Sequence, residues 1–323
     1  MMTSLDPAVT VSRDGIAQTA PCVAIILVNW NGQTDTLACL SSLSQLQYPN
    51  YSVMVIDNGS TDDSVTTIRV AYPQVTVIES GANLGFVGGN NIGLDRARNL
   101  GADYALLLNN DTEVAPDFLQ LLVEAAEADP QVGIVGPLIY YFDRPDVVWS
   151  AGGAIDWAGG STRMLGLNEE DHGQFDPAPH LVDFVTGCAL LIKMPLVEQV
   201  GMLDPRFFAY YEETEWCVRA TRAGQKILLV PRARIWHKIS LTAREASPQV
   251  HYYMVRNRLL FLKLARMGPG PWVRTLLLDY ARTLLSWTLK PGWRHKTPQR
   301  QAMVRAILDF GRGRFGKVEG AGK

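Results

Sequence analysis

Short apolar runs that each end abruptly on polar residues constrain the fold most. These runs cover residues 23–28, 51–56, 75–78 and 104–108. Segments with helical spacing or helix-start signals separate them. Strands that alternate with helices in this way predict βαβ units, so we expect an α/β fold with a mainly parallel, Rossmann-like central sheet flanked by helices. Ligands of such sheets bind just beyond the carboxyl ends of the strands.

The run at 104–108 stops on Asn109, Asn110 and Asp111. A continuous apolar run of this length is typical of a strand buried on both faces, which places the three polar side chains in the crevice beyond it. Oxygen-rich side chains there suit Mg²⁺ or Mn²⁺. The alternative is that Asn-Asn-Asp is turn chemistry between a strand and a helix. These residues alone leave both interpretations open.

Two further strand exits carry candidate ligand-binding residues. Asp57 is placed to accept hydrogen bonds from a nucleotide base or ribose. The alternative is that it belongs to a turn and helix-cap cluster, which would have the same sequence pattern. Residues 83–91 hold three glycines and three asparagines before a helix expected around 91–99. Such a segment could cradle a phosphate at a helix start, or it could be a flexible turn. It is neither a G-x-G-x-x-G after the first strand nor a Walker loop.

Acidic residues gather again at 212–215, after an aromatic run. Acids in a helix's first turn complement its dipole, and Gly224 is a natural stop for such a helix. Aromatic surroundings also raise the pKa of a carboxylate, which suits a general base that deprotonates an alcohol. His237 follows another apolar segment and could complete a metal or pyrophosphate site with Lys238, or be structural.

The composition indicates a folded chain and restricts the compartment in which it works. A chain of 323 residues with 47% hydrophobic content can bury a full core. Its four cysteines are scattered and form no C-x-x-C pair, which favours a reducing cytoplasm and argues against structural zinc. Residues 1–20 lack the basic and apolar regions of a signal peptide, so we interpret them as a flexible leader.

The charge is divided unevenly along the chain. Residues 1–240 carry a net charge of −14, whereas residues 241–323 carry +12. The basic part predicts contact with an anionic partner, either nucleic acid or a membrane surface; the alternative is a solvated basic face packed on an acidic neighbour. From residue 247 the pattern is helical, with breaks at 268–271 and 290–292.

Within this basic part, residues 272–289 are apolar but interrupted by charges, so they fall short of a membrane span. They suit a helix that lies on a membrane surface, and Trp272, Trp287 and Trp293 suit such an interface. An amphipathic helix docked on its own domain or on a partner subunit is the alternative.

The motifs together resemble one family. They are Asn29-Trp30-Asn31, residues 57–62, 83–91 and 108–112, residues 201–208, the acids of 212–215, Trp236-His237 and Arg256-Asn257. In order and spacing, over about residues 22–262, the chain closely resembles the family 2 glycosyltransferases of the GT-A fold, in particular the bacterial rhamnosyltransferase-like branch.

This resemblance implies sugar transfer from a nucleotide-diphosphate sugar to an acceptor hydroxyl, with inversion at the anomeric carbon and with Mg²⁺ or Mn²⁺. Asn109 and Asp111 fall on the DxD metal motif, and His237 matches a family histidine near the diphosphate. Glu213 falls on the catalytic base. The implied donor-binding residues are Asn29, Asn31, Asp57, Asn83, Gly85, Asn109 and Asn110.

Two departures from the family pattern affect these roles. The first Asp of the DxD motif is Asn109, which removes one anionic ligand. The usual Glu-Asp pair is Glu212-Glu213, so the base is one methylene longer, or Glu212 serves instead.

We expect a leader at 1–20, a GT-A domain at 21–245 and a basic helical extension at 246–323. The donor would be dTDP-rhamnose or a UDP-sugar, and the acceptor a glycan or lipid-linked hydroxyl in cell-surface polysaccharide synthesis. The site of action would be the inner face of the cell membrane, with peripheral contact through the extension and no nucleic acid. The alternatives are a nucleotide-sugar-binding protein without turnover, or a nucleotidyltransferase. The latter should carry a glycine-rich loop with Lys or Arg after the first strand, and residues 29–32 do not.

Overall fold

The computed structural model describes residues 20–239 and 247–318. The expected leader, apart from residue 20, lies outside this range. So does the expected boundary between residues 245 and 246.

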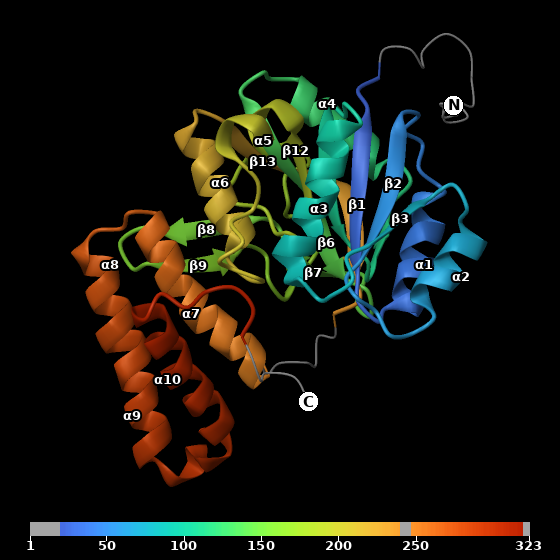
Figure 1. The fold of residues 1–323 in the computed structure, drawn as a ribbon. Coiled ribbons are helices and arrows are strands. Elements are labelled where there is room, and N and C mark those ends of the chain that lie inside the picture. The colour runs from blue at the N-terminus through green and yellow to red at the C-terminus, as the bar shows by residue number, and fades with distance from the viewer. Residues whose placement is uncertain (1–19, 240–246, 319–323) are drawn as a thin grey trace.

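A mixed, mainly parallel sheet runs through the larger part of the molecule (Figure 1). Its parallel half has the order β3-β2-β1-β4. The bounds are β1 (Val23–Asn29), β2 (Tyr51–Asp57), β3 (Thr76–Glu79) and β4 (Tyr104–Asn109). Beyond β4 lie the antiparallel β12 (Ala189–Lys193) and then β6 (Val132–Tyr141). The predicted α/β fold is confirmed.

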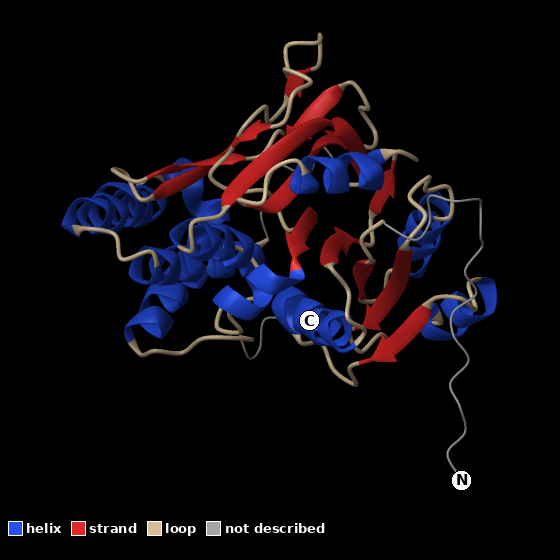
Figure 2. Cartoon of the chain, turned by 90° about the horizontal axis from the view of Figure 1, so that it is seen from above, coloured by secondary structure: helices blue, strands red, loops and turns tan. Residues whose placement is uncertain are grey.

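Helices lie on both sides of the strands (Figure 2). They are α1 (Gln33–Leu43), α2 (Ser64–Ala71), α3 (Gly85–Asn99), α4 (Phe118–Glu127), α5 (Met194–Val200) and α6 (Glu212–Arg222). Alternate residues of β1 enter separate apolar clusters: Ala24 and Ile26 belong to one, and Val23, Ile25 and Leu27 to the other. This burial on both faces explains why the strand reads as one continuous apolar run.

Helix α3 begins at Gly85, so the expectation of a helix starting near residue 91 is wrong. The glycines after residue 85 lie within the helix. A Cβ atom on Gly89 would come within 2.8 Å of Val28, and one on Gly93 within 2.3 Å of Ile26. These glycines therefore let α3 pack closely on β1. This packing explains why a helical segment has the composition of a glycine-rich loop.

The region from 142 to 180 contains short strands, two of which form a hairpin. These strands are β7 (Val147–Ser150), β8 (Gly153–Asp156), β9 (Ser161–Met164), β10 (Glu169–Glu170) and β11 (His180–Leu181). β8 and β9 form the hairpin. A loop separates β11 from β12.

The long strand β13 (Lys226–His237) carries the chain back across the sheet. It runs parallel to β6 and antiparallel to the short β5 (Thr112–Val114). Its last residue, His237, pairs with Thr112. The end of β13 is thereby brought beside the exit of β4.

A helical extension follows, as predicted, and packs below the sheet in Figure 1. It comprises α7 (Pro248–Leu264), α8 (Pro269–Val273), η1 (Arg274–Ala281), α9 (Arg282–Leu289), η2 (Pro291–Lys296) and α10 (Thr297–Gly311). Buried residues of α7, η1 and α10, among them Leu259, Tyr280 and Met303, form its core. Within residues 20–239 and 247–318, no helix combines the length and apolarity needed to cross a bilayer.

Candidate active site

Two cavities meet at the carboxyl ends of β1 and β4. The first, of about 830 Å³, includes Asn58, Asn83 and Asn110 in its wall, and we call it the strand-end cavity. The second, of about 860 Å³, contains Glu212 and Glu213 and is called the glutamate cavity. Both volumes are typical of small-molecule sites. Residues common to both walls are Phe86, Asn109, Asp111, Ala209 and Tyr210.

Asn29 and Asp57 form a buried hydrogen-bonded pair at the ends of adjacent parallel strands. Asn29 Nδ2 donates to Asp57 Oδ1 at 3.0 Å, and the Ser60 amide donates to Asp57 Oδ2 at 3.0 Å. Asn29 Oδ1 accepts from the Thr36 hydroxyl at 2.9 Å. These contacts hold the first two strand exits together, and neither side chain is among those that line the strand-end cavity.

Asn31 has the same kind of supporting contacts. Its φ is +52°, and its Oδ1 accepts from the Thr61 amide at 2.7 Å. Trp30, between the two asparagines, is exposed and lines the cavity instead. An exposed aromatic side chain there offers a flat face to a planar ring. The residue pattern gave Trp30 no role, although an aromatic residue at a polar strand exit is the signal that could have indicated one.

Asn58 and Asn83 shape the wall near the start of α3. Asn58 Nδ2 donates to the Gly85 carbonyl at 3.0 Å and its Oδ1 accepts from the Leu84 amide at 3.0 Å. Asn83 Oδ1 accepts from the Gly85 amide at 2.9 Å. Gly85 has a φ of +74°, and a Cβ atom there would lie 2.5 Å from the Phe208 carbonyl oxygen. The structure thus places Asn83 and Gly85 in the cavity wall, together with Asn58.

Asp111 and His237 lie together although they are far apart in sequence. The pairing of β13 with β5 sets their separation, and Asp111 Oδ1 is 3.1 Å from His237 Nε2. Burial disfavours charge on His237, but the Cys188 sulfur and the Asp111 carboxylate raise its pKa to about 10. Burial works against ionisation of Asp111 as well, yet the hydrogen bond from His237 leaves the pKa of Asp111 below its usual value.

Lys238 points away from this pair. Its Nζ is 3.2 Å from Glu113 and 3.5 Å from Asp35, and it lies over the Phe142 ring. It is absent from the walls of both cavities. The interpretation that Lys238 completes a pyrophosphate site with His237 is therefore not supported by its position.

Asp111 and His237 suit a divalent cation that is shared with a phosphorylated ligand. Across the described residues, no group of three or more His, Cys, Asp or Glu side chains gathers to hold a metal. Mg²⁺, however, is commonly held by one or two carboxylates together with substrate phosphates and water. The Asp111 carboxylate, which lines both cavities, fits that arrangement. His237 beside it could join as a ligand once its imidazole has released its proton, because only a neutral imidazole coordinates a metal.

Glu212 and Glu213 begin α6 and face the glutamate cavity. Burial raises the pKa of both carboxyl groups, and repulsion from Glu213 raises that of Glu212 further. Glu212 is the more buried, and its Oε2 has no hydrogen-bond partner within the described ranges. Glu212 therefore retains its proton to higher pH, so Glu213 is the carboxylate that ionises first.

The loop before these acids has an unusual backbone. Phe208, Tyr210 and Tyr211 have φ values of +70°, +73° and +73°. Such left-handed conformations are costly for bulky residues and persist only when the surroundings hold them.

Two buried residues of α7 hold this loop. Asn257 Nδ2 lies 2.9, 2.7 and 2.9 Å from the carbonyl oxygens of Phe207, Ala209 and Tyr210, and Arg256 Nη2 donates to the Phe207 carbonyl at 2.9 Å. The sequence marks Arg256-Asn257 without giving a role. The structure shows that the pair fixes the approach to Glu212 and Glu213.

Sequence comparison relates the chain to glycosyltransferases. The profile of the family described as "Glycosyl transferase family 2" matches residues 24–199. An N-acetylglucosaminyl-diphospho-decaprenol L-rhamnosyltransferase of Mycobacterium tuberculosis is 28% identical over 87% of this chain and 92% of its own length. A dTDP-rhamnosyl transferase, RfbF of Shigella flexneri, is 24% identical over 74% of this chain and 79% of its own.

Solved structures agree on the fold. GalNAc-T7 with UDP, GalNAc and Mn²⁺ aligns with 91% of this chain and 56% of its own, with a TM-score of 0.62 and 16% identity. The mannosyltransferase PcManGT from Pyrobaculum calidifontis, in complex with GDP-Man and Mn²⁺, aligns with 91% of this chain and 88% of its own. Its TM-score is 0.57, at 14% identity.

Proposed function

Because this chain belongs to glycosyl transferase family 2 and is a glycosyltransferase, we propose that it is an inverting, metal-dependent rhamnosyltransferase. In this proposal the donor is dTDP-rhamnose, with a UDP-sugar as the next candidate. The acceptor is a hydroxyl of a glycan or lipid-linked sugar in cell-surface polysaccharide synthesis.

One observation carries the proposal. Asp111 and His237 lie in the wall of the same cavity as Glu213, and Asp111 also borders the strand-end cavity. A nucleotide in the strand-end cavity would place its diphosphate at Asp111. The transferred sugar would then extend toward Glu213, where the acceptor enters.

The reaction needs one base and one means of stabilising the leaving group. Glu213 accepts the proton of the acceptor hydroxyl as that oxygen forms a bond to the anomeric carbon, and the bond from this carbon to the diphosphate oxygen breaks. A divalent cation held by Asp111 and His237 would offset charge on the departing diphosphate. Because the oxygen attacks from the face opposite the leaving group, the anomeric configuration inverts.

The walls of the glutamate cavity support a large, partly apolar acceptor. Trp149, Leu167, Phe184, Ile239 and Met254 line it. The hairpin β8–β9 adds Thr162, Arg163 and Met164, and is tied to the extension by a hydrogen bond from Arg258 Nε to the Gly160 carbonyl at 2.8 Å. The M. tuberculosis relative is named for a diphospho-decaprenol substrate, which motivates a lipid-linked acceptor here.

Transfer itself tests the proposal. The purified chain with Mn²⁺ should be stabilised by dTDP-rhamnose more than by UDP-glucose or GDP-mannose, since a ligand that binds only the folded state raises Tm. With a synthetic prenyl-diphosphate-linked N-acetylglucosamine, it should release dTDP and form a product whose anomeric configuration, read by NMR, is inverted. A folded protein that neither binds nor turns over any sugar nucleotide would contradict the proposal.

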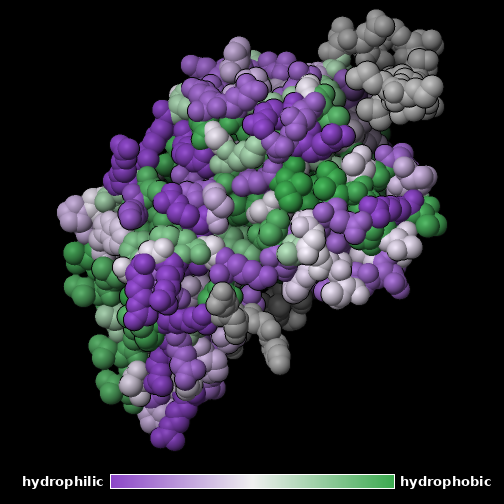
Figure 3. Space-filling view, in the orientation of Figure 1, coloured by the Kyte–Doolittle hydropathy of each residue, from purple (hydrophilic) through white to green (hydrophobic). Residues whose placement is uncertain are grey.

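We also propose peripheral contact with the inner face of the cell membrane through the extension, residues 246–323. Trp272 and Trp287 support this less than expected, because they pack on Phe310 and His251 at ring distances of 5.8 and 5.4 Å. Exposed leucines of η1 and α9 support it more, and a hydrophobic surface lies over α8 and α9 at the lower left of Figure 3.

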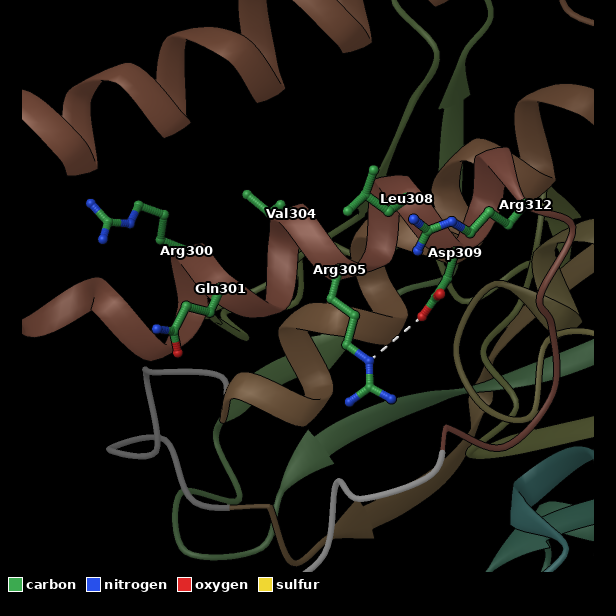
Figure 4. Close-up of a pocket in the computed structure, with 7 residues that line it drawn as sticks. All are labelled: Arg300, Gln301, Val304, Arg305, Leu308, Asp309 and Arg312. Carbon is green, nitrogen blue, oxygen red and sulfur yellow. Dashed lines mark ion pairs between the residues drawn. The ribbon is translucent and has the colours of Figure 1, made fainter.

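Basic side chains lie beside apolar ones along α10 of the same extension. Figure 4 shows Arg300, Arg305 and Arg312 along α10, with Arg305 reaching toward Asp309 at 3.6 Å. Apolar side chains beside basic ones are typical of helices that lie in an anionic lipid interface.

Replacing both Leu277 and Leu278, each 60% exposed, by Gln should weaken binding to vesicles that contain anionic lipid by about tenfold. Cosedimentation measures the bound fraction. The matched control replaces Val70 and Leu100, also exposed but on the sheet domain, by Gln. Equal binding of both variants and the wild type would contradict membrane contact through this surface.

A further inference from the structure

The last described residues of the chain return to the sheet domain and reach the strand-end cavity. We call residues 313–318 the C-terminal strap. Two of them, Lys317 and Val318, line the cavity together with Asn58, Asn83 and Asp111. The family profile ends at residue 199, so this contribution comes from outside the matched segment.

Hydrogen bonds anchor the strap on either side of Lys317. The Gly316 amide donates to the Arg206 carbonyl at 2.9 Å, and Arg256 Nη1 donates to the Gly316 carbonyl at 2.7 Å. The Val318 amide donates to the Tyr253 hydroxyl at 3.0 Å. The backbone position of Lys317 is therefore fixed independently of its own side chain.

The side chain of Lys317 contacts another residue of the cavity wall, Asn83. Its Nζ donates to the Asn83 carbonyl oxygen at 3.1 Å, next to the start of α3. Within the described ranges, no carboxylate lies at ion-pair distance from this ammonium group. The described residues therefore leave its charge available to an anion that enters the cavity.

The strand-end cavity has little positive charge to offset that of an anionic ligand. Of the described residues that line it, Lys317 is the one with a cationic side chain, and Asp111 contributes a carboxylate. A nucleoside diphosphate carries negative charge on both phosphates. A lysine ammonium is a compact donor that binds phosphate oxygens through charge-assisted hydrogen bonds.

We infer that Lys317 is a further donor-binding residue, which contacts the phosphate oxygens of the nucleoside diphosphate in the cavity that Asp111 also lines. This inference rests on the proposed function and adds a binding contact to it. The helical extension then contributes directly to the donor site through the strap that follows α10.

Titration of dTDP with Mg²⁺ into the full-length protein, followed by calorimetry, tests this contact. Lys317→Ala should raise the Kd by about tenfold, because it removes a charge-assisted hydrogen bond to phosphate. Lys317→Arg should recover most of the affinity. In turnover, Lys317→Ala should raise KM for the donor and also lower kcat, because negative charge on the departing diphosphate grows during transfer.

Arg314→Ala is the matched control. It removes one positive charge from the same strap, but Arg314 is largely exposed and does not line the strand-end cavity. Its Kd for dTDP should equal that of the wild type. Raising the salt concentration should weaken binding more in the wild type than in Lys317→Ala, because screening acts on the charge that the variant lacks.

The outcomes separate the contact from the function it rests on. If the wild type binds dTDP and Lys317→Ala binds it equally well, the contact is overturned and the proposed function stands. If the folded wild type binds no nucleoside diphosphate, both are overturned. Should Lys317→Ala melt at a lower temperature than the wild type, Lys317→Gln, which keeps a donor to the Asn83 carbonyl but no charge, decides the same question.

Discussion

Glu213→Gln is expected to lower kcat by about 10²–10⁴-fold, the usual contribution of a positioned general base. Glutamine keeps the shape of the side chain but cannot accept the acceptor proton. Binding of dTDP should be unchanged, because Glu213 lines the glutamate cavity and not the strand-end cavity. Steady-state kinetics with the proposed donor, alongside dTDP titration, measure the two effects separately.

Glu212→Gln is the matched control for this variant. Because Glu212 keeps its proton while Glu213 is ionised, a neutral glutamine resembles its working state, and most of the activity should remain. A large loss in Glu212→Gln together with near-normal turnover in Glu213→Gln would assign the base to Glu212 instead.

The pH dependence should identify the same group. Burial raises the pKa of Glu213 above the ordinary 4.5, so kcat should fall as pH decreases through this raised value. Between 4.5 and that value the folded chain binds more protons than the unfolded chain, so the free energy of unfolding decreases as pH rises. In Glu213→Gln, the residual kcat should no longer fall as pH decreases through this range. The free energy of unfolding should also decrease less steeply as pH rises, which thermal melts at several pH values would show.

Asp111→Asn is expected to lower transfer by at least about 10³-fold, because it removes the carboxylate proposed to hold the cation against the diphosphate. Mn²⁺ affinity, followed by electron paramagnetic resonance of free Mn²⁺, should fall in parallel. Asparagine is the appropriate replacement since it preserves the size of a side chain that touches both cavities.

Loss of the ion pair with His237 needs its own control. His237 is buried, and it would lose the partner that favours its charged form, so the melting temperature of Asp111→Asn must be compared with that of the wild type. Asp117→Asn, an exposed acid at the start of α4, removes the same charge away from the cavities. Wild-type transfer and Mn²⁺ affinity in a folded Asp111→Asn protein would contradict the assignment of Asp111 to the metal.

The sequence predicted the parallel half of the sheet well, because each strand is a short apolar run with a polar exit. It misplaced the start of α3, since the glycines at 88, 89 and 93 weaken any local helix signal. The close approach of that helix to Val28 and Ile26 explains Gly89 and Gly93, whereas a Cβ atom on Gly88 would meet Leu84 of the same segment. Tertiary packing decides such positions, and no local pattern reports it.

The candidate site was predictable only where a residue directly follows a recognisable strand. Asp111 follows directly from the strand that precedes it. Its contact with His237 depends on the register between β5 and β13, which spacing along the chain does not reveal. Lys317 carries no local signal at all, because its position depends on the path of the whole extension.

Arg256 and Asn257 fix residues 206–210 through hydrogen bonds to their carbonyl oxygens, and this has a consequence for chimeric enzymes. An exchange of C-terminal segments between relatives, made to alter membrane targeting, would also replace the scaffold that shapes the entrance to the reaction centre. Hybrids joined after α7 keep this scaffold intact, whereas hybrids joined before it inherit a foreign one.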